Sequence, residues 1–173
     1  RSRPLVGEPC LLTEKGAWGR EHAPHWAGWL WGLGLTIGGG ILGARASSTR
    51  VGHRVGGVVL AGFGLLFGLL GTVNVLLWAF SELNAYGPNA NWWLSNPLSF
   101  AWLLGGLSLA RGRCPRWLPS VSGLVAILAT GGLLLEWTPL DAQRNLGFIG
   151  LLWPVWVAGA LWARQQSRSA RDS

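Results

Sequence analysis

The chain has 173 residues, of which 50% are hydrophobic and 12% charged, and its net charge is +7. Soluble globular domains carry about 25% charged residues, so this composition argues against a soluble domain. The alternative of a soluble bundle of buried helices would need amphipathic helices to cover it, and none is evident. The basic excess does not indicate nucleic-acid binding, because the arginines cluster at the ends of apolar runs without interleaved stacking aromatics.

The first 25 residues are polar and contain several glycines and prolines, which predicts an irregular extracytoplasmic linker over 1–25. The chain begins with Arg1 and contains no methionine. We therefore expect a processed product or a part of a longer protein.

Five apolar runs follow, at 26–44, 55–80, 97–110, 117–135 and 146–163. About 20 residues at 1.5 Å each cross a hydrocarbon core about 30 Å thick, so each run is expected to form a transmembrane helix. The third run is short for a span. Asn96 and Pro97 suit the N-cap and first position of its helix, and residues 91–95 either extend it or lie in the interface. Pro154 predicts a kink in the fifth helix.

Arginine placement sets the expected orientation. The loops after the first and third runs and the tail over 164–173 hold Arg45, Arg50, Arg54, Arg111, Arg113, Arg116, Arg164, Arg168 and Arg171. The other two loops hold only Arg144. The apolar runs predict an all-α multi-pass membrane helix bundle with five spans over 26–163. The positive-inside rule then places the N-terminus outside and the basic tail in the cytoplasm.

Tryptophan and glycine add packing expectations. Tryptophans near span ends, such as Trp29, Trp78 and Trp162, are expected at headgroup level, whereas Trp102, Trp153 and Trp156 are expected to fill helix contacts. Glycine pairs four residues apart, at 34/38, 39/43 and 64/68, let helix backbones approach closely. We expect them to pack the first span against the second, with a dimer interface as the alternative.

Cysteine and histidine give no sign of a cofactor. Cys10 and Cys114 are expected on opposite sides of the membrane and so do not form a disulfide with each other. Neither they nor His22, His25 and His53 have the spacing of a metal site, and no metal or other cofactor is expected.

Polar side chains concentrate between the second and third runs. The candidate site residues there and before the last run are Glu82, Asn89, Asn91, Asn96 and Asn145. Two interpretations remain open: the amides fix the irregular backbone at the helix ends, or they form an outer site facing a lipid headgroup, a substrate or a neighbouring domain. Asn74 in the second run also needs a partner, because an unpaired polar group at membrane depth is costly. No catalytic residue is expected, since no nucleophile accompanies a base.

The loop also carries a short pattern. It consists of Ser81, Glu82, Asn89, Asn91, Asn96, Pro97 and Leu98, together with Pro4–Pro9 before the first run and Gln143-x-Asn145 before the last. This pattern resembles the membrane region of the Lnb-type lipoprotein N-acyltransferases, which have an outward-facing cysteine-dependent domain followed by a C-terminal helical membrane region. The chain departs from the family in having Leu83, where a histidine tends to follow the acidic residue, and Tyr86, where a small hydroxyl is usual.

The resemblance implies a membrane-anchoring domain of a bacterial envelope protein in the cytoplasmic (inner) membrane. Such a domain would position an upstream extracytoplasmic domain and a lipid substrate; its partners would be membrane lipids, that domain and lipoproteins, and no nucleic acid. The catalytic residues of the family belong to the upstream domain, so we expect no activity from these 173 residues alone. The alternatives are a stand-alone small transport or assembly protein and a self-contained intramembrane enzyme.

Overall fold

The computed structural model of the protein describes residues 25–47, 49–80, 93–135 and 146–169. Over these ranges the chain is helical and contains no strand. The helices are α1 (His25–Ala46), α2 (Arg50–Phe80), the 3-10 helix η2 (Pro97–Phe100), α4 (Ala101–Ala110), α5 (Leu118–Leu135) and α6 (Leu146–Ser169). The five expected runs are confirmed as helices within a few residues of their predicted ends, except that α2 begins five residues earlier and α6 continues six residues into the expected tail.

Four of these helices (α1, α2, α5 and α6) are long and apolar enough to cross a membrane, and the apolar helix over Pro97–Ala110 is shorter. The expected class, an all-α multi-pass membrane bundle, is confirmed. The short third helix rises about 2.0 Å per residue in η2 and about 1.5 Å in α4, which gives about 23 Å in all. It therefore does not cross a 30 Å hydrocarbon core by itself.

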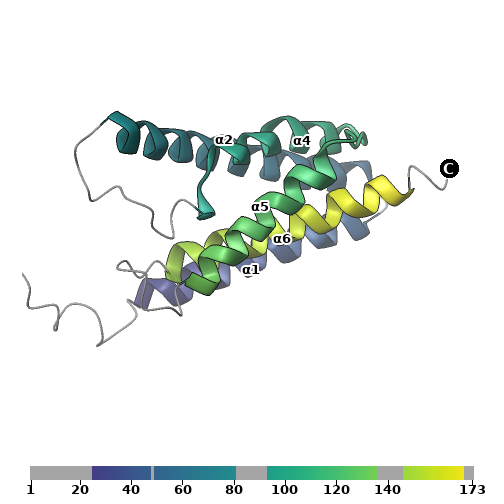
Figure 1. The fold of residues 1–173 in the computed structure, drawn as a ribbon. Coiled ribbons are helices and arrows are strands. Elements are labelled where there is room, and N and C mark those ends of the chain that lie inside the picture. Colours follow the sequence, from purple (N-terminus) through teal and green to yellow (C-terminus); the bar gives the residue numbers. More distant parts are fainter. Residues whose placement is uncertain (1–24, 48, 81–92, 136–145, 170–173) are drawn as a thin grey trace, which may run out of the picture.

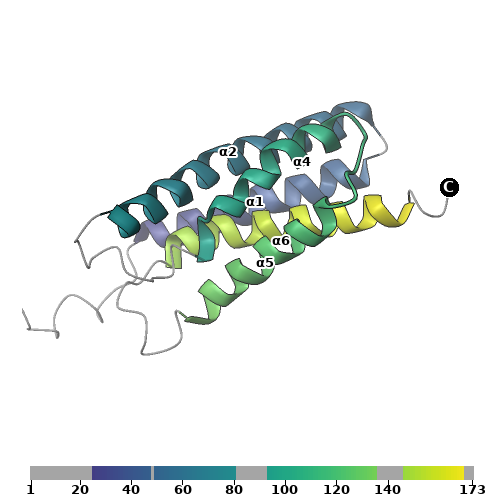
Figure 2. The same ribbon diagram turned by 45° about the horizontal axis from the view of Figure 1, so that its top comes forward.

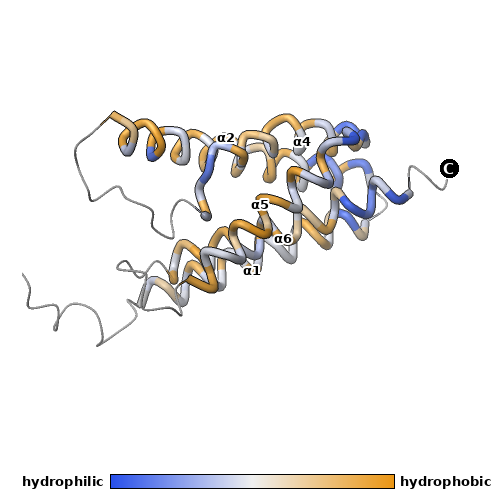
Figure 3. Tube along the Cα trace, in the orientation of Figure 1, coloured by the Kyte–Doolittle hydropathy of each residue, from blue (hydrophilic) through white to orange (hydrophobic). Residues whose placement is uncertain are grey.

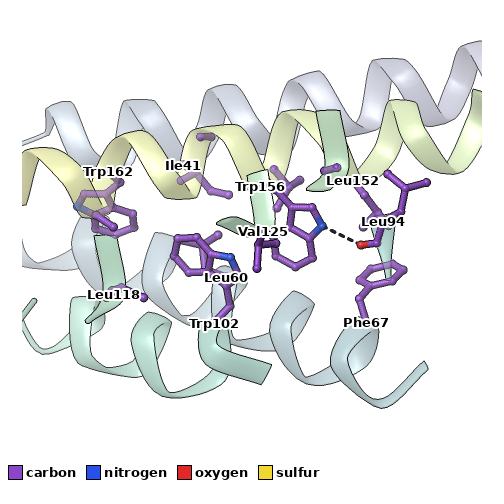
Figure 4. Packing of buried hydrophobic residues seen from close by; sticks show 14 of the residues in the cluster. Ile41, Leu60, Phe67, Leu94, Trp102, Leu118, Val125, Leu152, Trp156 and Trp162 are labelled. Carbon is purple, nitrogen blue, oxygen red and sulfur yellow. Dashed lines mark hydrogen bonds between the residues drawn. The ribbon is translucent and has the colours of Figure 1, made fainter. Parts of the chain in front are cut away.

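The helices form two layers (Figures 1 and 2). One layer contains α2 with η2 and α4 alongside part of its length, and the other contains α1, α6 and α5. Helix α6 lies at the centre: 67% of its most apolar stretch is buried, against 22–33% in the other three long helices. A stacked pair of tryptophans, Trp102 of α4 and Trp156 of α6, joins the layers, with ring centroids 6.3 Å apart (Figure 4).

Glycines set the close helix contacts, but not between the expected partners. A Cβ added at Gly38 of α1 would lie 2.8 Å from the carbonyl oxygen of Pro154 in α6. A Cβ added at Gly64 of α2 would lie 2.6 Å from the Trp102 side chain in α4. The expectation that these glycine pairs pack the first span against the second is therefore wrong. Gly34 and Gly38 of α1 pack against α6, the pair 64/68 of α2 packs against η2 and α4, and the pair 39/43 has no neighbour within 4 Å in the described chain.

Two further details concern α6. Trp162, expected near headgroup level, is fully buried and packs edge-on against His53 beside Arg54, with centroids 5.6 Å apart, so it fills a helix contact at the arginine-bearing end of α2. Helix α6 is also continuous through Pro154, which is buried against α1.

Hydrophilic residues gather at one end of the bundle, as Figure 3 shows. At this end α1, α4 and α6 finish and α2 and α5 start, so the three expected arginine groups lie together. We call it the arginine end. A second hydrophilic stretch lies deep in the bundle, just before η2.

Candidate functional site: a helix break beside a pocket

The chain breaks its helical course between Trp93 and Pro97 while it is buried in the protein. Leu94, Ser95 and Asn96 are all buried, at 1%, 8% and 8% exposure. A Cβ added at Gly71 of α2 would lie 2.6 Å from the Asn96 backbone. Only glycine at position 71 leaves room for this irregular backbone to lie directly on α2.

The break has a local cause in the sequence. Proline disfavours helical geometry in the residue before it, and Asn96 is extended, with φ −122° and ψ 156°. The Ser99 amide then donates to the Asn96 carbonyl over 2.9 Å, which starts η2. The expected helix start at Pro97 is confirmed, but the Asn96 side chain does not cap the helix. Its amide donates instead to the Trp93 carbonyl, over 3.3 Å.

Three side chains donate hydrogen bonds to backbone carbonyls at the break. Besides Asn96, the Trp156 indole of α6 donates to the Leu94 carbonyl over 3.2 Å (Figure 4), and the Ser95 hydroxyl donates to the Phe67 carbonyl over 2.9 Å. Irregular backbone at membrane depth is tolerated where protein groups satisfy it in this way. The first of the two sequence interpretations, that polar side chains fix irregular backbone, thus holds for Asn96.

Position along α2 gives the depth of the break. Phe67 lies 13 residues from Arg54, or about 20 Å at 1.5 Å per residue. With Arg54 at one membrane surface, the break lies about two-thirds of the way through a 30 Å hydrocarbon core. The short helix Pro97–Ala110, about 23 Å long, covers this same distance between the break and the arginine end.

A pocket of about 180 Å³ lies beside the break, between α2 and α6. Its lining is Phe67, Leu70, Asn74, Leu94, Ser95, Phe148 and Leu152. The wall is apolar except at Asn74 and Ser95. The Asn74 side chain is half-buried, and no hydrogen bond joins its amide to another residue of the described ranges. The pocket thus pairs an apolar wall with a carboxamide that is free, within the described chain, to bind a ligand.

Two buried polar atoms near the break also lack a partner. The Asn96 carbonyl oxygen (Oδ1) and the Ser99 hydroxyl make no hydrogen bond within the described part of the chain. Ser99 is fully buried, so its hydroxyl is shielded from solvent. Buried polar groups are ordinarily paired, with protein groups or with ordered water, so these two atoms are positions where a water or a ligand atom could bind.

Of the candidate residues expected from the sequence, the structure describes only Asn96, which lies in the break. Glu82, Asn89, Asn91 and Asn145 lie outside the described residues. Ser95 and Trp156 were not expected to act together, because 61 positions separate them in the chain. The available signal was the Ser-Asn-Pro sequence, in which two hydrogen-bonding side chains precede a helix-starting proline.

Within the described ranges no group of three or more His, Cys, Asp or Glu side chains could hold a metal ion. Comparison of the chain with protein-family models, curated proteins and solved structures found no match. The four long apolar helices indicate a multi-pass helical membrane protein. Any inference about its activity has to rest on the geometry of the helix break and the pocket beside it.

Proposed function

We propose that the chain is the membrane domain of a bacterial envelope protein resembling the Lnb-type lipoprotein N-acyltransferases, and that it presents a membrane lipid to an upstream extracytoplasmic domain. The pocket between α2, the helix break and α6 is the observation that carries this proposal. Its lining combines apolar side chains with one amide and one hydroxyl. This combination suits the region of a phospholipid in which an acyl chain meets its ester.

The level of the pocket supports a lipid ligand. Asn74 lies 20 residues from Arg54 along α2, or about 30 Å, which matches the thickness of the hydrocarbon core. When Arg54 lies at the cytoplasmic surface, Asn74 lies at the level of the outer ester groups. The Asn74 amide would then donate to an ester carbonyl oxygen, and Leu70 and Phe148 would contact the acyl chain.

The ends of the helices support a role beside an outer domain. With the arginine end in the cytoplasm, the linker over 1–25 joins α1 on the outer side. The segments 81–92 and 136–145 follow α2 and α5 on the same side. An upstream domain, Glu82 with Asn89 and Asn91, and the mouth of the pocket would thus share one side of the membrane.

Lipid photolabelling of the full-length protein tests this proposal. We would measure crosslinking of a phospholipid that carries a diazirine on its acyl chain, in the Leu70→Trp and Asn74→Leu variants. The first substitution fills the pocket and the second removes its amide, so labelling of the pocket helices should fall severalfold. Leu69→Trp is the matched control, because Leu69 is also exposed on α2 but does not line the pocket. Equal labelling in all three variants would mean that only bulk lipid is sampled.

A second experiment separates a site from a structural latch in the outer loop. Glu82, Asn89 and Asn91 are replaced singly by alanine in the full-length protein. Loss of acyl transfer at normal membrane level supports a site, whereas loss of the protein itself supports a latch. Normal acyl transfer at a normal level in every variant would argue against any role for this loop.

A further inference from the structure

A second pocket, of about 470 Å³, lies at the arginine end, where α2 begins and α4 finishes. Its lining is Arg50, His53, Arg54, Ala110, Arg111 and Gly112. It lies at the opposite end of α2 from Asn74, so it belongs to the other membrane surface.

Charge in this pocket is of one sign. Arg50, Arg54 and Arg111 carry guanidinium groups on exposed side chains, and the pocket lining contains no carboxylate. None of the residues that the structure describes is Asp or Glu, so within those ranges no ion pair neutralises the arginines. Like charges held close together repel, and a bound anion would relieve that repulsion.

The backbone beneath the pocket is closely packed. A Cβ added at Gly57 of α2 would lie 2.6 Å from the Ala110 backbone nitrogen, so α2 and α4 meet directly below the arginines. Gly112 adopts a φ of +73°, which glycine tolerates best, and its amide donates to the Leu109 carbonyl over 2.9 Å. This turn fixes Arg111 beside the first turn of α2. The arginines are therefore brought together by the fold rather than by chance contact of loops.

We propose that this pocket binds the phosphate of an acidic phospholipid headgroup in the leaflet at the arginine end. Guanidinium groups bind phosphate oxygens through paired, charge-assisted hydrogen bonds. Basic pockets between transmembrane helices bind anionic headgroups. The exposed Val51, Val55 and Val58 on the same part of α2 offer an apolar surface for the acyl chains below the headgroup. The proposal does not depend on the function of the outer pocket.

Binding of phosphatidylglycerol to the purified full chain in neutral detergent tests the proposal, measured by native mass spectrometry. Each arginine near an anionic headgroup contributes about fivefold in affinity, so the Arg54→Gln/Arg111→Gln double variant should bind about 25-fold more weakly. Arg168→Gln is the matched control, because Arg168 is exposed near the same end but does not line the pocket. Arg54→Lys/Arg111→Lys keeps the charge but loses the paired geometry, and it should bind with intermediate affinity.

Three comparisons make the outcome decisive. Phosphatidylcholine, whose headgroup is zwitterionic, should bind more weakly than phosphatidylglycerol to the unmodified chain. Inorganic phosphate should compete poorly, and phosphate binding as tight as that of the lipid would overturn the headgroup assignment. The melting temperature in neutral detergent shows whether each variant is folded. Among folded variants, an equal loss in Arg168→Gln and the double variant would overturn the pocket.

Discussion

The indole of Trp156 donates a hydrogen bond to the carbonyl of Leu94 over 3.2 Å, although 62 positions separate the two residues in the chain. The acceptor lies in the helix break, and the donor lies in the most buried helix of the bundle. The same indole ring stacks on Trp102. One side chain thus joins the broken third helix to the centre of the bundle by both a polar and an aromatic contact.

Replacing Trp156 by phenylalanine should destabilise the bundle. Phenylalanine retains an aromatic ring but leaves the Leu94 carbonyl without its donor, which should cost about 1 kcal/mol of unfolding free energy. The melting temperature in detergent measures the effect. Trp29→Phe is the control, because Trp29 is 81% exposed and should tolerate the change. Equal melting temperatures for the two variants would contradict a role for the indole nitrogen.

Ser95→Ala tests the contact of the break with α2. The Ser95 hydroxyl donates to a carbonyl of another helix, so we expect a loss of about 0.6 kcal/mol, the average for polar contacts between membrane helices, and at most about 1.7 kcal/mol. Ser108→Ala is the control, since the Ser108 hydroxyl bonds only the Leu104 carbonyl within α4. Denaturation in mixed micelles gives both values, and a larger loss for Ser108→Ala would count against the importance of the break.

Glycine substitutions on the two faces of α1 should have different effects on the stability of the bundle. A side chain at Gly34 would overlap the Gly150 and Leu151 backbone of α6, so Gly34→Leu should disrupt the bundle and lower its yield in the membrane. Gly39 has no neighbouring atom within 4 Å in the described chain, so Gly39→Leu should be tolerated. Size-exclusion profiles of the two purified variants make the comparison. A dimer that is lost selectively in Gly39→Leu would instead revive the alternative of a glycine-lined dimer interface.

Cys114 offers a test of both burial and orientation. Burial raises the pKa of the Cys114 thiol, so less of it is thiolate at pH 7 than in an exposed cysteine, and it should react slowly with maleimides. The rate should rise as the pH increases toward the raised pKa. The comparison is Arg113→Cys in a Cys10→Ser/Cys114→Ser background, because Arg113 is exposed and Cys10 would otherwise react as well. In Cys10→Ser chains, which lack the other native cysteine, a membrane-impermeant maleimide should label Cys114 or the cysteine at position 113 only from the cytoplasmic side, and labelling from outside would overturn the N-out orientation.

Hydrophobic runs and charge allowed the helices to be predicted, because a bilayer demands long apolar stretches and leaves arginines at their ends. Pro97 likewise marked a helix start, since the constraint that proline imposes is local. The partners of the glycines could not be predicted, because a small residue allows close approach without specifying which helix approaches. The hydrogen bond from Ser95 to the Phe67 carbonyl could not be predicted either. It depends on which turn of α2 lies beside the segment before Pro97, and the sequence does not specify that. The burial of Trp162 against His53 could not be predicted either, because it depends on which helix packs beside α6.

The central position of α6 bears on how the protein is made. It follows every other described helix in the chain, yet it supplies the surface on which α1 and α5 pack. During synthesis the earlier helices therefore enter the bilayer before α6 has been made. Until then the Leu94 carbonyl lacks the Trp156 indole as its hydrogen-bond donor. Assembly must then proceed by late docking of α6 among helices already inserted. A nascent chain interrupted before α6 would leave the Leu94 carbonyl in the break without its indole donor.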